Sequence, residues 1–396
     1  MNTRVPEARG RVNSVDALRG FVMIIMALDH VREFHHRGAM SFPPEDLART
    51  TAWLFMTRWV THICAPVFMF TAGVGAFYWL SRGRTVGELT RFLWKRGIWL
   101  LFLDLVVLRL VMFFSLTSGP VILNVLWALG WCMIALGLLA RLPAGILASL
   151  SIAMIIFHNL ADSIRAADFG KAGWIWNVIH EQGAFRAGPL LVVSAYPLVP
   201  WIGVMAAGFC FGRIMMLEPA RQRMWTFRIG LGLTLGFLVV RGINAYGDPR
   251  PWSSSISGMT VLSFLRCNKY PPSLDFLLMT LGPALMLLSW FGRFTFSANN
   301  PLIVFGRTPL FFFIVHFLLA HLLAIPIALF RYGRADFLWL PMPSMGGSPE
   351  TYPPGYGLEL GAVYVVWAVV VVLMYPLCLW FRGVKERNPG SWLAYC

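Results

Sequence analysis

Ten apolar stretches, each long enough or nearly long enough to cross a membrane as a helix, constrain this chain more than any other feature. The hydrocarbon core of a bilayer is about 30 Å thick, and a helix needs roughly 20 residues to cross it. The stretches lie near residues 15–34, 54–80, 92–114, 121–140, 143–158, 190–214, 226–243, 274–292, 301–330 and 359–381. They predict an all-α protein, a polytopic transmembrane helical bundle of about ten spans. We treat residues 1–396 as a single integral-membrane domain.

The composition excludes a water-soluble protein. Hydrophobic residues make up 58% of the chain and charged residues only 13%, whereas a soluble domain contains about 25% charged residues. So little polar surface rules out a cytosolic enzyme, a fibrous protein and a disordered chain. The formal net charge of +15 would indicate a nucleic-acid partner in a soluble chain, but a membrane protein has a simpler source for it.

Lysine and arginine are distributed unequally over the predicted loops. If the N-terminus is cytoplasmic, the inner segments contain 17 Lys and Arg, and the outer segments contain 13 in nearly twice the length. Because positive residues favour the cytoplasmic side, an even number of spans with both termini cytoplasmic fits this bias. The excess charge then reflects topology and attraction to anionic membrane lipids, and we expect no nucleic-acid partner.

Histidines are the most informative candidate functional residues. None of the eight lies in a predicted cytoplasmic segment, and seven lie in an outer loop or in the outer half of a span. Histidine transfers protons near neutral pH, so we expect a site that opens toward the outer face. A structural role is the alternative for His35, His36, His158 and His180, because histidine is an ordinary residue at a membrane interface.

The first span contains the ionisable pair Asp29 and His30, with Arg19 eleven residues before His30. Eleven residues are almost three helical turns, so Arg19 and His30 project from one face about 16 Å apart. Glu33 follows His30 by three residues, close enough to orient the imidazole. This face could hold the two ends of one long substrate. Alternatively, Arg19 reaches the lipid headgroups and His30 makes a structural hydrogen bond.

Two further spans contain histidines at a similar depth. His62 lies in the second span and His321 in the ninth, and both lie roughly one to three helical turns below the outer surface, as His30 does. The three histidines could therefore meet in one cavity. His316 lies nearer the middle of the ninth span.

A basic cluster follows the second span on the predicted cytoplasmic side. It consists of Arg82, Arg84, Arg91, Lys95 and Arg96. Such a cluster suits the phosphates of a nucleotide-like cosubstrate or the headgroups of lipids. The six cysteines contain no CxxC pair, so we expect neither a metal site nor disulfides. The sequence contains no convincing motif of a P-loop ATPase, a serine hydrolase or a zinc protease.

The segment Ser14–His30 resembles the opening signature of the membrane acyltransferase superfamily, in which an LRG motif precedes a histidine by three helical turns. Here the motif is Leu18, Arg19 and Gly20. Further segments resemble the bacterial family related to heparan-α-glucosaminide N-acetyltransferase. They are Thr57–Phe77, Tyr196–Arg213, Lys269–Pro283 and Phe305–His321. The similarity runs from the first span to the C-terminal tail.

The resemblance implies a membrane-bound acyltransferase that takes acetyl from cytoplasmic acetyl-CoA and transfers it to a hydroxyl or amine of an extracytoplasmic glycan. The lysosomal relative acetylates a terminal glucosamine of heparan sulfate, and it has Asn at the position of His30. This chain looks like a protein of a bacterial cytoplasmic (inner) membrane. Its acceptor and its oligomeric state stay open at this point.

The resemblance also suggests roles for the candidate residues. The acetyl-CoA ligands would be Arg19, Arg82, Arg84, Lys95 and Arg96. His30 would be the general base, with Asp29 or Glu33 orienting it, and His62 and His321 are candidate second acids or oxyanion donors. Direct transfer and a histidine-acyl intermediate both fit the sequence. The alternative function is a transporter or permease, in which intramembrane His, Asp and Arg residues form a proton or substrate path.

Overall fold

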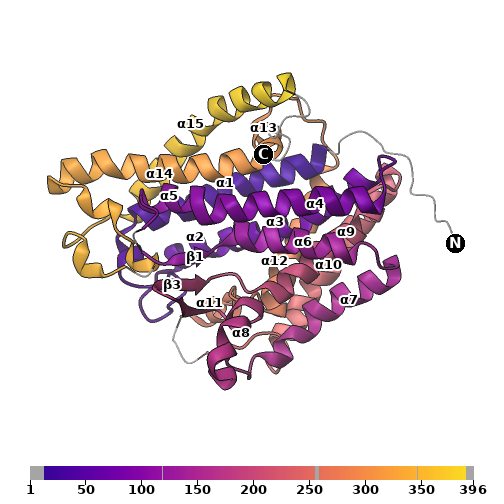
Figure 1. Ribbon diagram of the computed structural model, residues 1–396, viewed down its shortest axis with the longest axis horizontal. Helices are drawn as coiled ribbons and strands as arrows, with labels where there is room; N and C mark the ends of the chain where they lie inside the picture. The colour runs from indigo at the N-terminus through magenta and orange to yellow at the C-terminus, as the bar shows by residue number, and fades with distance from the viewer. Residues whose placement is uncertain (1–12, 118, 255–257, 346, 389–396) are drawn as a thin grey trace.

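A helix occupies each of the ten predicted ranges in the computed structural model, which describes residues 13–117, 119–254, 258–345 and 347–388 (Figure 1). The α-helices are α1 (Asn13–His35), α2 (Ala52–Val60), α3 (Cys64–Leu80), α4 (Val86–Phe102), α5 (Arg109–Phe113), α6 (Val125–Leu139), α7 (Ala144–Phe157), α8 (Gly173–Ile179), α9 (Leu198–Met215), α10 (Pro219–Ile243), α11 (Thr260–Leu265), α12 (Leu274–Phe291), α13 (Pro301–Arg307), α14 (Pro309–Tyr332) and α15 (Leu360–Arg387). The predicted all-α class is therefore confirmed, and the strands in the described residues form one small sheet.

Seven helical stretches of the described residues are long and apolar enough to cross a membrane. They are Ala52–Leu80, Ala144–Ala161, Leu198–Met215, Pro219–Ile243, Leu274–Phe291, Pro309–Tyr332 and Leu360–Arg387. The other predicted spans are α6, which is apolar but shorter, α4, which has 17 residues, and α1, which contains five Asp, Glu and Arg residues. The chain is an integral membrane protein, and the count of about ten spans stays a prediction.

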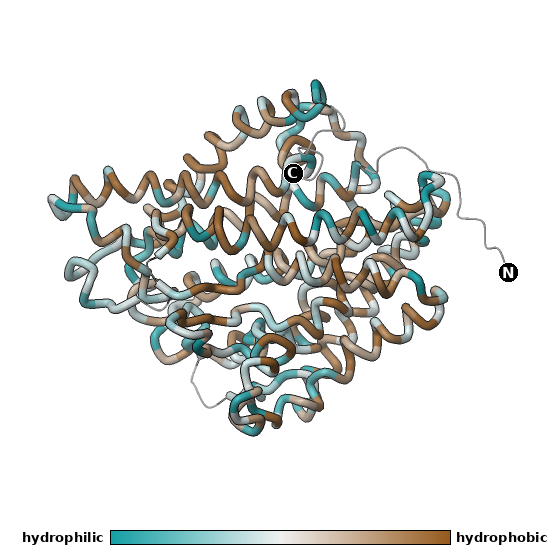
Figure 2. The backbone as a smooth tube through the Cα atoms, in the orientation of Figure 1, coloured by the Kyte–Doolittle hydropathy of each residue, from teal (hydrophilic) through white to brown (hydrophobic). Residues whose placement is uncertain are grey.

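The long helices run between two ends of the molecule (Figure 1). Arg307 of α13 lies 3.4 Å from Asp16 at the start of α1, and Arg382 near the end of α15 donates to Asn299 at 2.9 Å. The start of α1 and the end of α15 therefore lie at one end, which we call the terminal end. Figure 2 shows hydrophobic residues along the helices and hydrophilic residues mainly at their ends and in the loops. That the terminal end faces the cytoplasm stays a prediction from the loop charges.

Glycines allow α1 and α13 to touch backbone to backbone. A Cβ on Gly20 would lie 1.9 Å from the carbonyl oxygen of Leu302, and a Cβ on Gly306 would lie 1.8 Å from the carbonyl oxygen of Asp16. Small residues permit this close approach between membrane helices. The glycine of the LRG motif therefore fixes α1 against α13, which positions the arginine beside it.

Some predicted spans differ from the observed helices. The ranges 121–140 and 190–214 begin with strands, β1 (Val121–Leu123) and β3 (Leu190–Ser194), which join β2 (Gly183–Ala187) in a sheet of order β1-β3-β2. β1 is parallel to β3, and β2 is antiparallel to it. A short run of Val, Ile and Leu fits a strand as well as a helix, so the predicted starts of these two spans were wrong. The range 301–330 is divided into α13 and α14 at Thr308, because α14 begins with a proline.

The third predicted span continues from α4 through a π-helical segment (Leu103–Leu108) into α5. Asp104 in this segment accepts a hydrogen bond at 3.0 Å from the backbone N–H of Asn124, the N-cap residue of α6. The side chain of Asn124 makes no capping hydrogen bond with the described part of α6. A carboxylate of one helix therefore stabilises the start of the next, because the first N–H groups of a helix need acceptors.

Candidate functional site

Three cavities follow one another along α1. The basic cavity, of about 430 Å³, includes Arg19. The central cavity, of about 30 Å³, includes His30, and the loop cavity, of about 480 Å³, includes Glu33. Because each helical residue advances 1.5 Å along the axis, the order of these residues in α1 is the order of the cavities, and the basic cavity lies nearest the terminal end.

Four arginines and an apolar wall line the basic cavity. The arginines are Arg19, Arg82, Arg84 and Arg96, and none of the described lining residues is acidic, so the cavity has a formal charge of +4. Arg19 donates to the backbone carbonyl of Thr71 at 2.6 Å. The predicted acetyl-CoA ligands are therefore brought together with one exception, since Lys95 on α4 is not among the described lining residues.

The Arg84 guanidinium lies over the Trp79 ring, 3.9 Å from its centroid. An aromatic face attracts a cation at this distance, so the stacking orders a side chain that is otherwise exposed. Much of the remaining wall is apolar and comes from α3, α4, α6 and α14. The cavity thus combines cations at its terminal end with an apolar passage toward the centre of the molecule.

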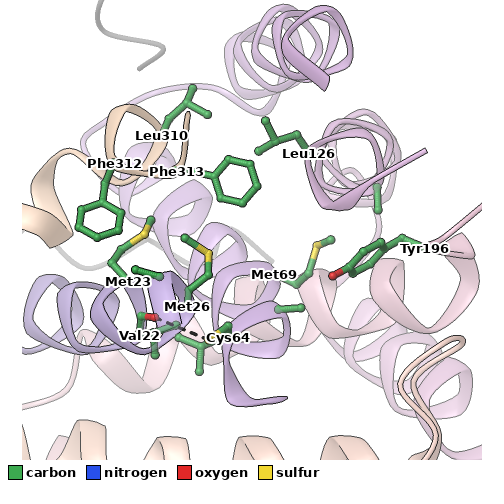
Figure 3. Packing of buried hydrophobic residues seen from close by; sticks show 14 of the residues in the cluster. Val22, Met23, Met26, Cys64, Met69, Leu126, Tyr196, Leu310, Phe312 and Phe313 are labelled. Atoms are coloured by element: carbon green, nitrogen blue, oxygen red, sulfur yellow. Dashed lines mark hydrogen bonds between the residues drawn. The ribbon is translucent and has the colours of Figure 1, made fainter. Parts of the chain in front are cut away.

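The central cavity adjoins the basic cavity. Phe68, Val125 and Phe313 line both. Figure 3 shows Phe313 of α14 and Leu126 of α6 facing each other, with Met26 of α1 close by. A volume of about 30 Å³ has room for about two water molecules, since one needs roughly 10–15 Å³ on this measure. Because Phe68, Val125 and Phe313 line both cavities, these three side chains separate the basic cavity from the central cavity.

His30 packs against α14 at the central cavity. Its Nδ1 atom lies 2.7 Å from Nε2 of His316, and its ring stacks on Phe317 with the ring centroids 3.9 Å apart. We expected Asp29 or Glu33 to make the hydrogen bond that orients this imidazole. Among the described side chains, His316 makes it instead, and both carboxylates are paired with arginines.

Asp29 and Glu33 belong to an ion-pair network at the far side of the central cavity. Asp29 accepts from Arg32 at 3.2 Å and also from Arg58 of α2, while Arg32 pairs with Glu33. The Nε atom of Arg58 donates to Glu45 at 2.9 Å. Three carboxylates therefore share two guanidiniums, and such pairing is what makes buried charges tolerable.

The loop cavity lies on the other side of this network. Its lining contains four of the five network side chains, all except Asp29, together with residues of the segments 39–44 and 343–349. Asp29 lines the central cavity, and its partner Arg58 lines the loop cavity. The ion pair between them is therefore the boundary between the two spaces.

The charges near this boundary shift the pKa of groups in the loops. Burial alone would raise the pKa of Glu45, but Arg58 and a hydrogen bond from His62 outweigh burial and hold this pKa well below its usual value. Burial would also raise the pKa of Tyr270, but Lys269 and Arg58 lower it. The carboxyl group of Glu45 is therefore ionised at neutral pH.

His62 and His321 do not join His30 at the central cavity, as far as its described lining shows. The Nε2 atom of His62 lies 3.3 Å from Glu45. The ring nitrogens of His321 each lie 2.9 Å from a backbone carbonyl oxygen, Nδ1 from that of Val111 and Nε2 from that of Leu338. The expected meeting of the three histidines is therefore not observed. Catalytic roles for His62 and His321 stay predictions.

Two residues of the central cavity were missing from the predicted site. Lys269 and Tyr196 line the cavity with His30. Each is the first residue of a segment that resembles the acyltransferase family, Lys269–Pro283 and Tyr196–Arg213, so a signal for them existed in the sequence. The described residues contain no group of three or more His, Cys, Asp or Glu that could hold a metal ion.

The chain matches a known family. Residues 11–242 match the family model described as heparan-alpha-glucosaminide N-acetyltransferase, catalytic, and no curated protein matches the chain. The matched residues include α1, the basic cluster and Arg58, whereas Lys269 and His316 lie beyond them. Since the match covers more than half of the chain, this protein belongs to the heparan-alpha-glucosaminide N-acetyltransferase catalytic family, a family of membrane acetyltransferases.

Proposed function

We propose that this protein transfers acetyl from acetyl-CoA in the basic cavity to an acceptor in the loop cavity, across a bacterial cytoplasmic membrane. The observation that supports the proposal is the order of the cavities along α1, with His30 between the two larger ones. Substrates that enter from opposite ends would meet at the central cavity. A transferase with its donor and acceptor on different sides of a membrane needs this arrangement.

Acetyl-CoA fits the chemistry of the basic cavity. Arginine side chains bind phosphates through paired N–H donors, and Arg82, Arg84 and Arg96 line this cavity. The pantetheine chain would extend along the apolar wall past Arg19 to Phe313, so that the thioester reaches the central cavity. The positive-inside bias of the loops supports entry from the cytoplasm.

The reaction needs a base and a donor for the developing oxyanion. His30 would take the proton of the acceptor hydroxyl or amine as that atom bonds to the acetyl carbonyl carbon. The carbon–sulfur bond then breaks, and the proton passes from His30 to the departing CoA thiolate. Lys269 and Tyr196 also line the central cavity, and they could stabilise the carbonyl oxygen as it becomes negative.

The loop cavity suits a sugar as the acceptor. Its volume of about 480 Å³ lies within the range of roughly 300–1,000 Å³ that is typical of ligand sites. The lining offers guanidinium donors, carboxylate acceptors and the hydroxyls of Ser41 and Ser344. We propose a glycan hydroxyl or amine in this cavity, with membrane lipids surrounding the apolar helices.

The release of CoA thiol tests the proposal. Purified protein in detergent, incubated with acetyl-CoA and a panel of glucosamine-containing oligosaccharides, is expected to release CoA. His30→Ala should reduce the rate by about 10²–10⁴-fold, the usual contribution of a general base. His158→Ala is the matched control, because His158 is a buried histidine whose Nδ1 lies 3.0 Å from the Ile155 carbonyl of its own turn.

Two results would contradict the proposal. If the wild-type protein neither binds acetyl-CoA nor releases thiol across the panel, the chain is not this enzyme. If proteoliposomes move a labelled acceptor across the membrane without consuming acetyl-CoA, the chain is a transporter. Undiminished activity of His30→Ala would leave the enzyme class intact but refute His30 as the base.

A further inference from the structure

A second histidine is placed to control the protonation of His30. His316 is fully buried on α14, and its Nε2 atom lies 2.7 Å from Nδ1 of His30. The other ring nitrogen of His316, Nδ1, lies 2.7 Å from the carbonyl oxygen of Phe312. The two rings and this carbonyl therefore form one chain of hydrogen bonds, which connects α14 with α1.

The direction of this chain follows from its last member. A carbonyl oxygen can only accept a hydrogen bond, so Nδ1 of His316 must be protonated. A neutral imidazole has one N–H, which leaves Nε2 of His316 as an acceptor. A charged His316 would need a compensating anion in these apolar surroundings, and no carboxylate of the described residues bonds to it. Nδ1 of His30 is therefore the donor.

We propose that His316 is a positioning residue that holds His30 in the tautomer with Nδ1 protonated and Nε2 free, an inference that rests on the proposed acetyl transfer. In this tautomer, the basic nitrogen of His30 is Nε2, and His30 lines the central cavity. When His30 takes a proton from the acceptor, the bond to His316 becomes charge-assisted and stronger. His316 thus orients the base before the reaction and stabilises it during the reaction.

Two aromatic rings keep His30 in this orientation. Phe317 stacks on its face at 3.9 Å and Phe313 contacts it edge-on at 6.0 Å, measured between ring centroids. Both residues belong to α14, as His316 does. Rotation of the His30 ring would break the bond to His316 and this packing together, so one helix fixes both the tautomer and the angle of the base.

Steady-state kinetics with two replacements at residue 316 test the role. His316→Phe keeps a ring but removes the acceptor, and we expect kcat to fall by about 10–100-fold, part of the roughly 10²–10⁴ that a general base contributes, with KM for acetyl-CoA unchanged. His316→Gln can place an oxygen near the position of Nε2, and it should recover most of kcat. Trp367→Phe is the control, because it also removes a hydrogen bond to α1, from Trp367 to the Ile24 carbonyl at 2.8 Å, and it should leave kcat unchanged.

A measurement without turnover separates this inference from the proposed function. Nitrogen-15 NMR of histidine-labelled protein reports which ring nitrogen is protonated, and His30 and His316 should both have Nδ1–H. His316→Phe should remove the Nδ1–H preference of His30. If wild-type His30 has Nε2–H, or if His316→Gln is as slow as His316→Phe, the role of His316 is refuted. If the NMR result is as expected but the wild type releases no CoA, the pair is correct and the proposed transferase is wrong.

Discussion

Arg58 is expected to be the most sensitive residue of the ion-pair network. Its side chain is 11% exposed, and it bonds Asp29 through Nη1 and Glu45 through Nε. Methionine has a similar length but no charge, so Arg58→Met would leave both carboxylates with weaker partners. The expected result is a clear loss of stability at neutral pH.

The size of the stability loss depends on which ion-pair partners Asp29 and Glu45 keep when Arg58 is replaced. Removing one partner of a buried ion pair usually destabilises a protein by about 3–5 kcal/mol, because a charge is left uncompensated. Asp29 keeps Arg32 at 3.2 Å, whereas Glu45 keeps only His62 at 3.3 Å among its described ion-pair partners. We therefore expect about 3 kcal/mol, and most of it should come from Glu45.

Unfolding by SDS in mixed micelles, followed by circular dichroism, measures this loss. Arg58→Met/Glu45→Gln should be more stable than Arg58→Met alone, because the uncompensated carboxylate is gone. Arg58→Lys should be intermediate, since one ammonium group cannot reach both carboxylates as a guanidinium does. If Arg58→Met lies within about 0.5 kcal/mol of the wild type, a surface value, the network does not stabilise the fold as argued.

Two further predictions concern Glu45 and Gly20. The folded-state pKa of Glu45 is well below its ordinary value. The ionised Glu45 side chain therefore stabilises the fold fully above its unfolded pKa of about 4.3, and this contribution is lost as pH falls toward the folded pKa. The difference in unfolding free energy between wild type and Glu45→Gln should be constant from pH 8 to 5 and shrink below pH 4. Gly20→Ala should destabilise by at least about 2 kcal/mol in the same assay, since overpacking against backbone is not relieved by side-chain motion. The control Gly232→Ala on α10, where a Cβ would meet no described atom within 4 Å, should not destabilise, and an equal loss in both would refute the steric argument.

The sequence predicted best which side chains share one face of a single helix. Arg19 and Met23 line the basic cavity, and Met26 and His30 line the central one. Their spacings of four, three and four residues follow the period of 3.6 residues per turn. A single face of α1 therefore connects the two cavities, as the eleven-residue separation of Arg19 and His30 predicted. The helical class of the chain follows from the same kind of local pattern.

Contacts between distant segments could not be predicted in this way. His30 and His316 are 286 residues apart, and no local periodicity indicates that α14 packs against α1. The expectation that Glu33 orients His30 relied on helical proximity alone, whereas Glu33 pairs with Arg32. Side chains on one helix compete with those of every helix packed against it, and a single sequence does not show which helices those are.

The partners of the buried ionisable residues narrow the search for the catalytic group. Burying an ionisable side chain in a membrane costs free energy unless the side chain is paired. Each buried ionisable residue is therefore a candidate functional residue. In the described structure most have structural partners, namely guanidiniums for Asp29, the backbone N–H of Asn124 for Asp104, the Gly119 carbonyl for Arg109, Glu45 for His62 and a backbone carbonyl for His321. His30 differs, because its partner is a neutral histidine and it lines a cavity between two larger ones. Structural partners thus account for much of the burial of these other ionisable residues, and the pair of His30 and His316 is where the chemistry is expected.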